Sequence, residues 1–143
     1  MKEKCILVTG STSGIGFSIT QKLLNCGAKV IGVGRNHSKF SIDHPNYVAY
    51  EVEMSDLHNL NIVMKRIIKE NDEITGLISN AGNGQFGPLE NFSIEQINSF
   101  ITVNLTSHIV VTKLILPQLK KRKVGDIIFI GSEAGLLGSK NGS

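Results

Sequence analysis

Residues 5–16 read Cys5-Ile6-Leu7-Val8-Thr9-Gly10-Ser11-Thr12-Ser13-Gly14-Ile15-Gly16. An apolar run stops at Thr9-Gly10, three hydroxyl residues follow, and a helical pattern begins at the last two glycines. This order predicts a buried strand, a tight turn and the start of a helix. Because such a turn directs backbone N–H groups and the positive end of the helix dipole at one point, we expect it to hold an anion, most often a phosphate.

Apolar runs mark four further strands, at residues 30–34, 47–52, 74–78 and 127–130. Each run is continuous rather than alternating, and helical patterns separate the runs along the chain. Strands of this kind are buried on both faces and pair in parallel. The sequence therefore predicts an α/β fold, a doubly wound parallel sheet of the Rossmann type, formed as one domain by residues 1–143.

The first two helices have recognisable ends. One follows Gly16, includes Ile15 in its apolar stripe and stops before Gly27, because glycine adopts the left-handed conformation that ends helices. The next covers residues 57–68, and either Ser55 or Asp56 can accept a hydrogen bond from its first turn.

Two more helices are expected between residues 93 and 123. The first is short and begins with a capping box of Ser93 and Gln96. The second runs from about residue 102 to 120, with Ile109 among its apolar positions. The basic cluster 120–123 follows it, where cations favourably meet the helix dipole, so we interpret the cluster as a solvated face.

Composition excludes several classes of protein. The chain has 143 residues, of which 41% are hydrophobic and 19% charged, and its net charge of +3 is too small to indicate a nucleic-acid or membrane surface. No apolar run approaches the roughly 20 residues of a membrane span. The two cysteines, Cys5 and Cys26, form no disulfide framework, which favours reduced thiols and a cytoplasmic location. No metal site is expected.

Ligands of a doubly wound sheet bind beyond the carboxyl ends of its strands. The spacing G-x-x-x-G-x-G from Gly10 to Gly16 lies at the first of these ends and resembles the short-chain dehydrogenase/reductase family. Three further features resemble that family in the same order: Asn80-Ala81-Gly82, Asn104 within Val103-Asn104-Leu105, and Ser132 after Ile130-Gly131. The resemblance covers essentially the whole chain.

This resemblance implies hydride transfer between a nicotinamide and a carbonyl or secondary-alcohol carbon of a small-molecule substrate. It implies that Ser132 orients the substrate oxygen and that Asn104 takes part in the proton relay. The residues implied in cofactor binding are Gly10, Ser11, Thr12, Ser13, Gly14, Ile15, Gly16, Arg35, Asn36, Glu53, Met54, Asn80, Ala81 and Gly82. Glu53 and Met54 stand where the family contacts adenine, although the family usually has Asp at the first position.

The end of the second strand predicts which dinucleotide is preferred. A carboxylate there usually accepts the ribose 2′-hydroxyl of NAD, but this chain has Gly34 followed by Arg35. A guanidinium pairs with a 2′-phosphate, so we expect NADP(H) rather than NAD(H). An exposed arginine at a strand end without a ligand is the alternative.

The family's Tyr-x-x-x-Lys pair is absent, because the only tyrosines, Tyr47 and Tyr50, have no lysine four places on. Counted from Ser132, the family's tyrosine falls just past Ser143. We therefore expect an N-terminal portion of an oxidoreductase that is inactive alone and keeps half of the interface through which family members form homo-oligomers. A non-catalytic dinucleotide-binding or interaction module is the alternative.

Overall fold

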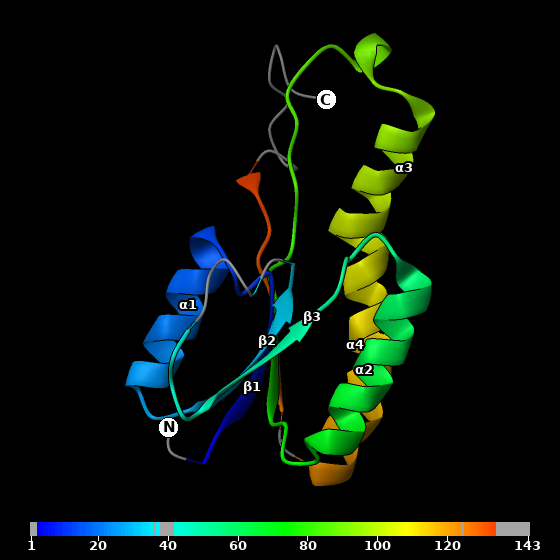
Figure 1. The fold of residues 1–143 in the computed structure, drawn as a ribbon. Coiled ribbons are helices and arrows are strands. Elements are labelled where there is room, and N and C mark those ends of the chain that lie inside the picture. Colours follow the sequence, from blue (N-terminus) through cyan, green and yellow to red (C-terminus); the bar gives the residue numbers. More distant parts are fainter. Residues whose placement is uncertain (1–2, 36, 38–41, 124, 134–143) are drawn as a thin grey trace.

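The computed structural model describes residues 3–35, 37, 42–123 and 125–133 (Figure 1). Five parallel strands form one sheet in the order β3-β2-β1-β4-β5. This confirms the predicted doubly wound α/β fold. The strands are β1 (Cys5–Thr9), β2 (Lys29–Gly34), β3 (Tyr47–Glu51), β4 (Gly76–Ser79) and β5 (Asp126–Phe129).

The centre of the sheet is β1, and all five of its residues are buried. Leu7 pairs with Ile31 of β2 on one side and with Leu77 of β4 on the other. The strand order reverses here, because the chain builds β2 and β3 on one side of β1 before it returns to build β4 and β5 on the other. At such a switch point the loops part and leave a crevice at the carboxyl ends of the strands.

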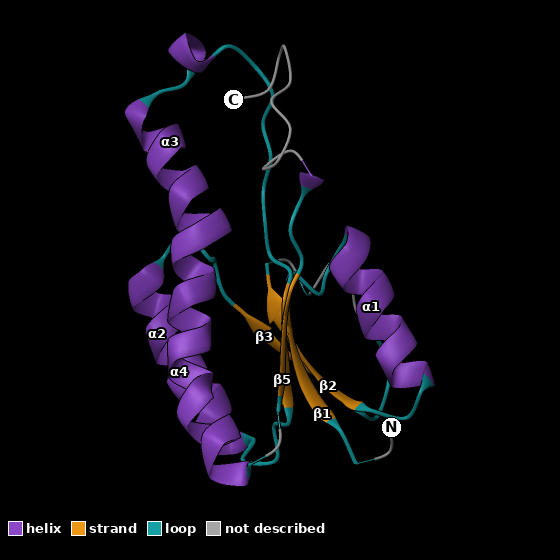
Figure 2. Ribbon diagram, turned by 180° about the vertical axis from the view of Figure 1, so that it is seen from behind, coloured by secondary structure: helices purple, strands orange, loops and turns teal. Residues whose placement is uncertain are grey.

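Helices cover both faces of the sheet (Figure 2). One face carries α1 (Gly14–Asn25), and the other carries α2 (Leu57–Glu70) beside α4 (Ser107–Arg122). Asp56 caps α2, because its Oδ1 accepts from the backbone N–H of Asn59 at 3.0 Å, which decides between the two caps considered. Gly27, with φ of +82°, follows α1 as expected.

The two helices expected after residue 93 are joined. The predicted capping box of Ser93 and Gln96 opens α3 (Ile94–Ile101), which continues through a π turn, η2 (Thr102–Thr106), into α4. The resulting 29-residue helix, Ile94–Arg122, is long and apolar enough to cross a membrane by length and composition, contrary to the sequence expectation. The second half of this helix is α4, which packs against α2 and the sheet, as the core helix of an α/β domain does.

Two positions expected on apolar helix faces are exposed. Ile15 is 62% exposed, because α1 begins at Gly14 and its buried side is formed by Gly16, Thr20 and Leu24. Ile109 is 58% exposed, since it lies about 200° around α4 from the buried Val111. These two predictions were wrong about the side of the helix that meets the sheet.

The two cysteines provide a chemical test of this fold. Cys5 is buried in β1, and burial raises the pKa of its thiol to about 11, whereas Cys26 is exposed after α1. A thiol reagent at pH 8 is therefore expected to modify Cys26 alone, because the thiolate is the reactive form. Peptide mass mapping with and without urea measures this, and modification of Cys5 in the folded protein would contradict the assignment of β1.

Candidate functional site

The turn between β1 and α1 has the form that the sequence predicts. Gly10 follows β1 with φ of +69°, and its N–H donates to the carbonyl of Val33 in β2 at 2.7 Å. Gly14 opens α1 with φ of +53°, a conformation that costs glycine little. The turn is therefore tied to the neighbouring strand, and two of its hydroxyl residues, Thr12 and Ser13, line the cleft described below.

A side chain that the sequence analysis did not single out locks this turn to the segment after β4. Thr9 Oγ1 accepts hydrogen bonds from the backbone N–H groups of Asn80 at 2.9 Å and Ala81 at 3.0 Å. In turn, the side-chain amide of Asn80 donates to the carbonyls of Thr9 at 3.1 Å and Gly10 at 3.4 Å. The only sequence signal for Thr9 is a hydroxyl residue at the end of an apolar strand.

The glycines allow these segments to meet. A Cβ on Gly10 would lie 2.9 Å from Ala81 Cα, closer than real Cβ atoms come. A Cβ on Gly16 would overlap the Gly10 carbonyl oxygen and the Asn80 amide. Gly16 is thus a contact point between α1 and the strand ends rather than a wall of the site.

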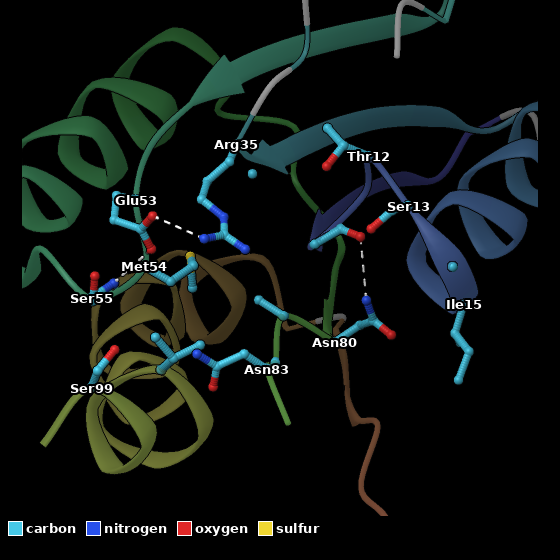
Figure 3. A pocket seen from close by; sticks show the side chains of 16 residues that line it. Thr12, Ser13, Ile15, Arg35, Glu53, Met54, Ser55, Asn80, Asn83 and Ser99 are labelled. Atoms are coloured by element: carbon cyan, nitrogen blue, oxygen red, sulfur yellow. Dashed lines mark hydrogen bonds and ion pairs between the residues drawn. The ribbon is translucent and has the colours of Figure 1, made fainter. Parts of the chain in front are cut away.

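A cleft of about 570 Å³ opens where these segments meet (Figure 3). The structure adds Gly34, Ser55, Asn83, Ser99 and Val103 to its walls. The predicted cofactor residues that line it are Gly10, Thr12, Ser13, Gly14, Ile15, Arg35, Glu53, Met54, Asn80, Ala81 and Gly82. One cleft therefore brings together residues from the ends of four strands.

Two of the predicted cofactor residues lie away from the cleft walls, and a third lies outside the described residues. Ser11 is fully buried, and its Oγ lies 3.2 Å from Tyr47 Oη, in space that Gly32 leaves open. Gly16 lies beneath the turn, as described above. Asn36 lies outside the described residues.

Arg35 and Glu53 form an ion pair on one wall of the cleft (Figure 3). Arg35 Nη1 lies 3.3 Å from Glu53 Oε2, while Glu53 Oε1 accepts from the backbone N–H of Ser55 at 3.3 Å. The two side chains are 61% and 41% exposed, so solvent screens the pair and it contributes about 0–1 kcal/mol. Arg35 therefore remains available to an anionic ligand.

The two predicted catalytic residues do not line this cleft. Asn104 lies in the π turn, where its amide donates to the Asn83 carbonyl at 2.9 Å and its Oδ1 accepts from the Asn83 N–H at 3.0 Å. It borders a smaller, adjoining cleft of about 280 Å³ beside Phe92 and Phe100. Ser132 is exposed beyond β5 and lines neither of these two clefts among the described residues.

The arrangement suits an elongated anion. In the described part of the chain, the N-cap Ser13 makes no side-chain hydrogen bond to α1, and the first turn of α1 carries no acidic residue. The N–H groups of that turn thus meet the cleft without a competing carboxylate, at the positive end of the helix dipole. No group of three or more metal-ligating side chains occurs among the described residues.

Comparisons with known proteins agree with this geometry. Residues 4–143 match the family described as short chain dehydrogenase. An uncharacterised oxidoreductase of Staphylococcus epidermidis is 30% identical over 94% of this chain and 60% of its own length. The 3-oxoacyl-[acyl-carrier-protein] reductase of Salmonella typhimurium is 32% identical over 95% of this chain and 57% of its own.

Solved structures show the same likeness. The ligand-free aldohexose dehydrogenase of Thermoplasma acidophilum matches with a TM-score of 0.87 and 26% identity. The match covers 99% of this chain and 54% of that one. The chain thus spans about half to three-fifths of the length of these relatives.

Gly16 and Gly84 allow a test of the close approach at the turn. Gly16→Ala is expected to destabilise the protein by about 1–3 kcal/mol, because the new methyl group overlaps the Gly10 carbonyl. Gly84→Ala is the control, since its Cβ meets nothing within 4 Å and its effect should stay within about 0.5 kcal/mol. Urea unfolding measures both, and equal stability of the two variants would rule out this packing.

Proposed function

The chain belongs to the short-chain dehydrogenase family, and on that premise we propose that it binds NADP(H) in the cleft as part of an oxidoreductase. The observation that carries the proposal is the position of Arg35 in the same cleft as the first turn of α1. The turn suits a pyrophosphate, and the guanidinium suits a 2′-phosphate.

The remaining walls fit the other parts of such a dinucleotide. Glu53 and Met54, after β3, stand near Arg35 and would meet the adenine. Asn80, Ala81 and Gly82 stand on the β4 side and would meet the nicotinamide half. When bound, the nicotinamide supplies or accepts the hydride that reduces a carbonyl or oxidises a secondary alcohol.

Two residues of this chain would serve that chemistry. Ser132 would orient the substrate oxygen through its hydroxyl. Asn104 would act from the π turn, and its paired bonds to Asn83 support a bracing role for the segment after Gly82.

The two tyrosines of this chain are poor candidates for the proton donor. Burial raises the pKa of Tyr47, whose hydroxyl lies between Ser11 and His37. Burial and the hydrogen bond to Glu70 raise the pKa of Tyr50. A general acid–base needs a pKa closer to the working pH, so we place the proton donor in a Tyr-x-x-x-Lys segment outside these 143 residues.

Location and assembly are inferred from the cysteines and from the long helix. The two unpaired cysteines support a reducing, cytoplasmic setting. Ile101, Leu105 and Ile109 are exposed at four-residue spacing along the long helix, and they support homo-oligomer formation through this face. A non-catalytic dinucleotide-binding module is the second candidate function. Such a module would bind the dinucleotide in the same cleft without catalysing hydride transfer.

Arg35→Ala tests the cofactor preference. Removing the guanidinium should weaken NADPH binding by about 10- to 100-fold, because a charged hydrogen-bonded partner of the 2′-phosphate is lost. NADH, which lacks that phosphate, should bind as before. Fluorescence titration of both dinucleotides measures this.

Arg66→Ala is the matched control, since Arg66 is also exposed and paired with a glutamate, Glu70, in α2. Glu53→Gln should strengthen NADPH binding by about 2- to 5-fold, because it frees Arg35 from a screened ion pair. The NADP(H) preference is wrong if wild-type protein binds both dinucleotides equally, or if Arg35→Ala weakens both.

Turnover separates the two candidate functions. The 143-residue chain is expected to bind NADPH without oxidising it in the presence of carbonyl compounds. A longer protein whose reading frame continues into a Tyr-x-x-x-Lys segment should oxidise NADPH, and Ser132→Ala in such a protein should lower kcat about 10²-fold. Carbonyl reduction by the 143-residue chain alone would refute the placement of the proton donor, and a frame without that segment favours the binding module.

A further inference from the structure

A buried histidine connects α4 to the wall of the cleft. His108 is 9% exposed, and its Nε2 lies 2.7 Å from the carbonyl oxygen of Ala81. Its Nδ1 lies 2.7 Å from Oγ of Ser79, the last residue of β4, which is fully buried. Both ring nitrogens therefore have short contacts to the strand end that leads into the cleft.

The chemistry of the two partners assigns the ring protons. A carbonyl oxygen only accepts hydrogen bonds, so Nε2 of His108 carries the proton that bonds to Ala81. In the neutral ring Nδ1 then accepts, and the hydroxyl of Ser79 donates to it. Each polar atom of this group is satisfied, as burial requires.

Ala81 is held from two sides. Its N–H donates to Thr9 Oγ1 in β1 at 3.0 Å, and its carbonyl accepts from His108 in α4. The peptide unit that contains this carbonyl also contains the N–H of Gly82, and the unit is planar, so fixing the oxygen fixes the direction of that N–H. Both Ala81 and Gly82 line the cleft.

The ring is supported by the neighbouring strand as well. Phe129 of β5 lies beside His108, with ring centroids 6.3 Å apart and planes tilted by 40°. Phe129 is also the register partner of Ser79. The His108 ring is thus hydrogen-bonded to the end of β4 and lies beside β5.

We propose that His108 is a positioning residue for the dinucleotide cleft, acting through the Ala81 carbonyl to fix the peptide unit between Ala81 and Gly82. This rests on the proposed function for the identity of the ligand, but the geometry belongs to the unliganded protein. The bond from Nε2 sets the cleft wall, whereas the bond from Nδ1 to Ser79 only fixes the ring.

Two substitutions separate these bonds. In His108→Gln, the side-chain amide reaches the position of Nε2 and can still donate to Ala81. In His108→Asn, the shorter amide reaches only the position of Nδ1, so the bond to Ser79 can be kept and the bond to Ala81 is lost. We expect His108→Gln to bind NADPH within about 3-fold of wild type and His108→Asn to bind about 10-fold more weakly.

A purely structural role of His108 predicts a different order of NADPH affinities among the variants. If His108 only filled the core, affinity would follow stability, so urea unfolding of both variants is measured beside binding. Equal affinity of His108→Asn and wild type overturns the proposal, as does a loss of affinity in His108→Gln that matches the loss in His108→Asn.

Hydrogen exchange tests the proposal without bound nucleotide. Exchange of the Ala81 amide hydrogen, which is buried and donates to Thr9 Oγ1, should be at least about 10-fold faster in His108→Asn than in wild type and nearly unchanged in His108→Gln. Equal exchange in all three proteins overturns the proposal. If wild-type protein binds no dinucleotide, the proposed function fails, while this exchange comparison still decides the role of His108.

The wild-type protein supplies a test that needs no variant. Nitrogen-15 chemical shifts of the His108 ring should show a protonated Nε2, the donor to the Ala81 carbonyl. A ring protonated only at Nδ1 would leave no donor for the Ala81 carbonyl and would overturn the proposal, even where His108→Asn fails to fold.

Discussion

One hydroxyl group holds the carboxyl ends of the two central strands together. Thr9 Oγ1 accepts from two successive backbone N–H groups, those of Asn80 and Ala81, and both bonds are near 3.0 Å. Without this acceptor, two buried or half-buried N–H groups would lose their partner, at a cost of about 1–3 kcal/mol each. The glycine turn, the cleft and the segment after β4 all take their positions from this contact.

The constraint explains why the site combines small and polar residues. The turn after β1 approaches the segment after β4 so closely that Gly10 and Gly16 leave no room for a Cβ. Polar groups at this approach must bond to one another, and the Asn80 amide does so with the Thr9 and Gly10 carbonyls. The rigid side of the cleft lies here, whereas Arg35 and Glu53 on the opposite wall are exposed and screened.

Local sequence patterns were sufficient for the architecture and for most of the cleft. Continuous apolar runs marked the strands, because a parallel sheet buries both faces, and glycine spacing marked the turn. Periodicity did not establish which side of a helix is buried, so Ile15 and Ile109 were placed wrongly. The joined helix was also missed, although residues 94–116 contain no glycine or proline that would separate two helices.

The residues that sequence reasoning missed act across long separations. Thr9, Asn83 and His108 matter through partners 21 to 72 residues away, and nothing near them in the chain indicates those partners. The family resemblance identified Asn104 as a site residue, but it did not indicate the hydrogen bonds of Asn104 to Asn83.

The span of the Thr9 contact also bears on how the protein is made. Its bonds join residues 71 and 72 positions apart. Until β4 and the residues after it have been synthesised, the turn at residues 10–16 is therefore held only by the bond from Gly10 to Val33. Closing a loop of this length costs entropy that only the assembled sheet repays. A nascent chain on the ribosome therefore carries the complete glycine motif long before it carries a site, and the cleft forms together with the central sheet.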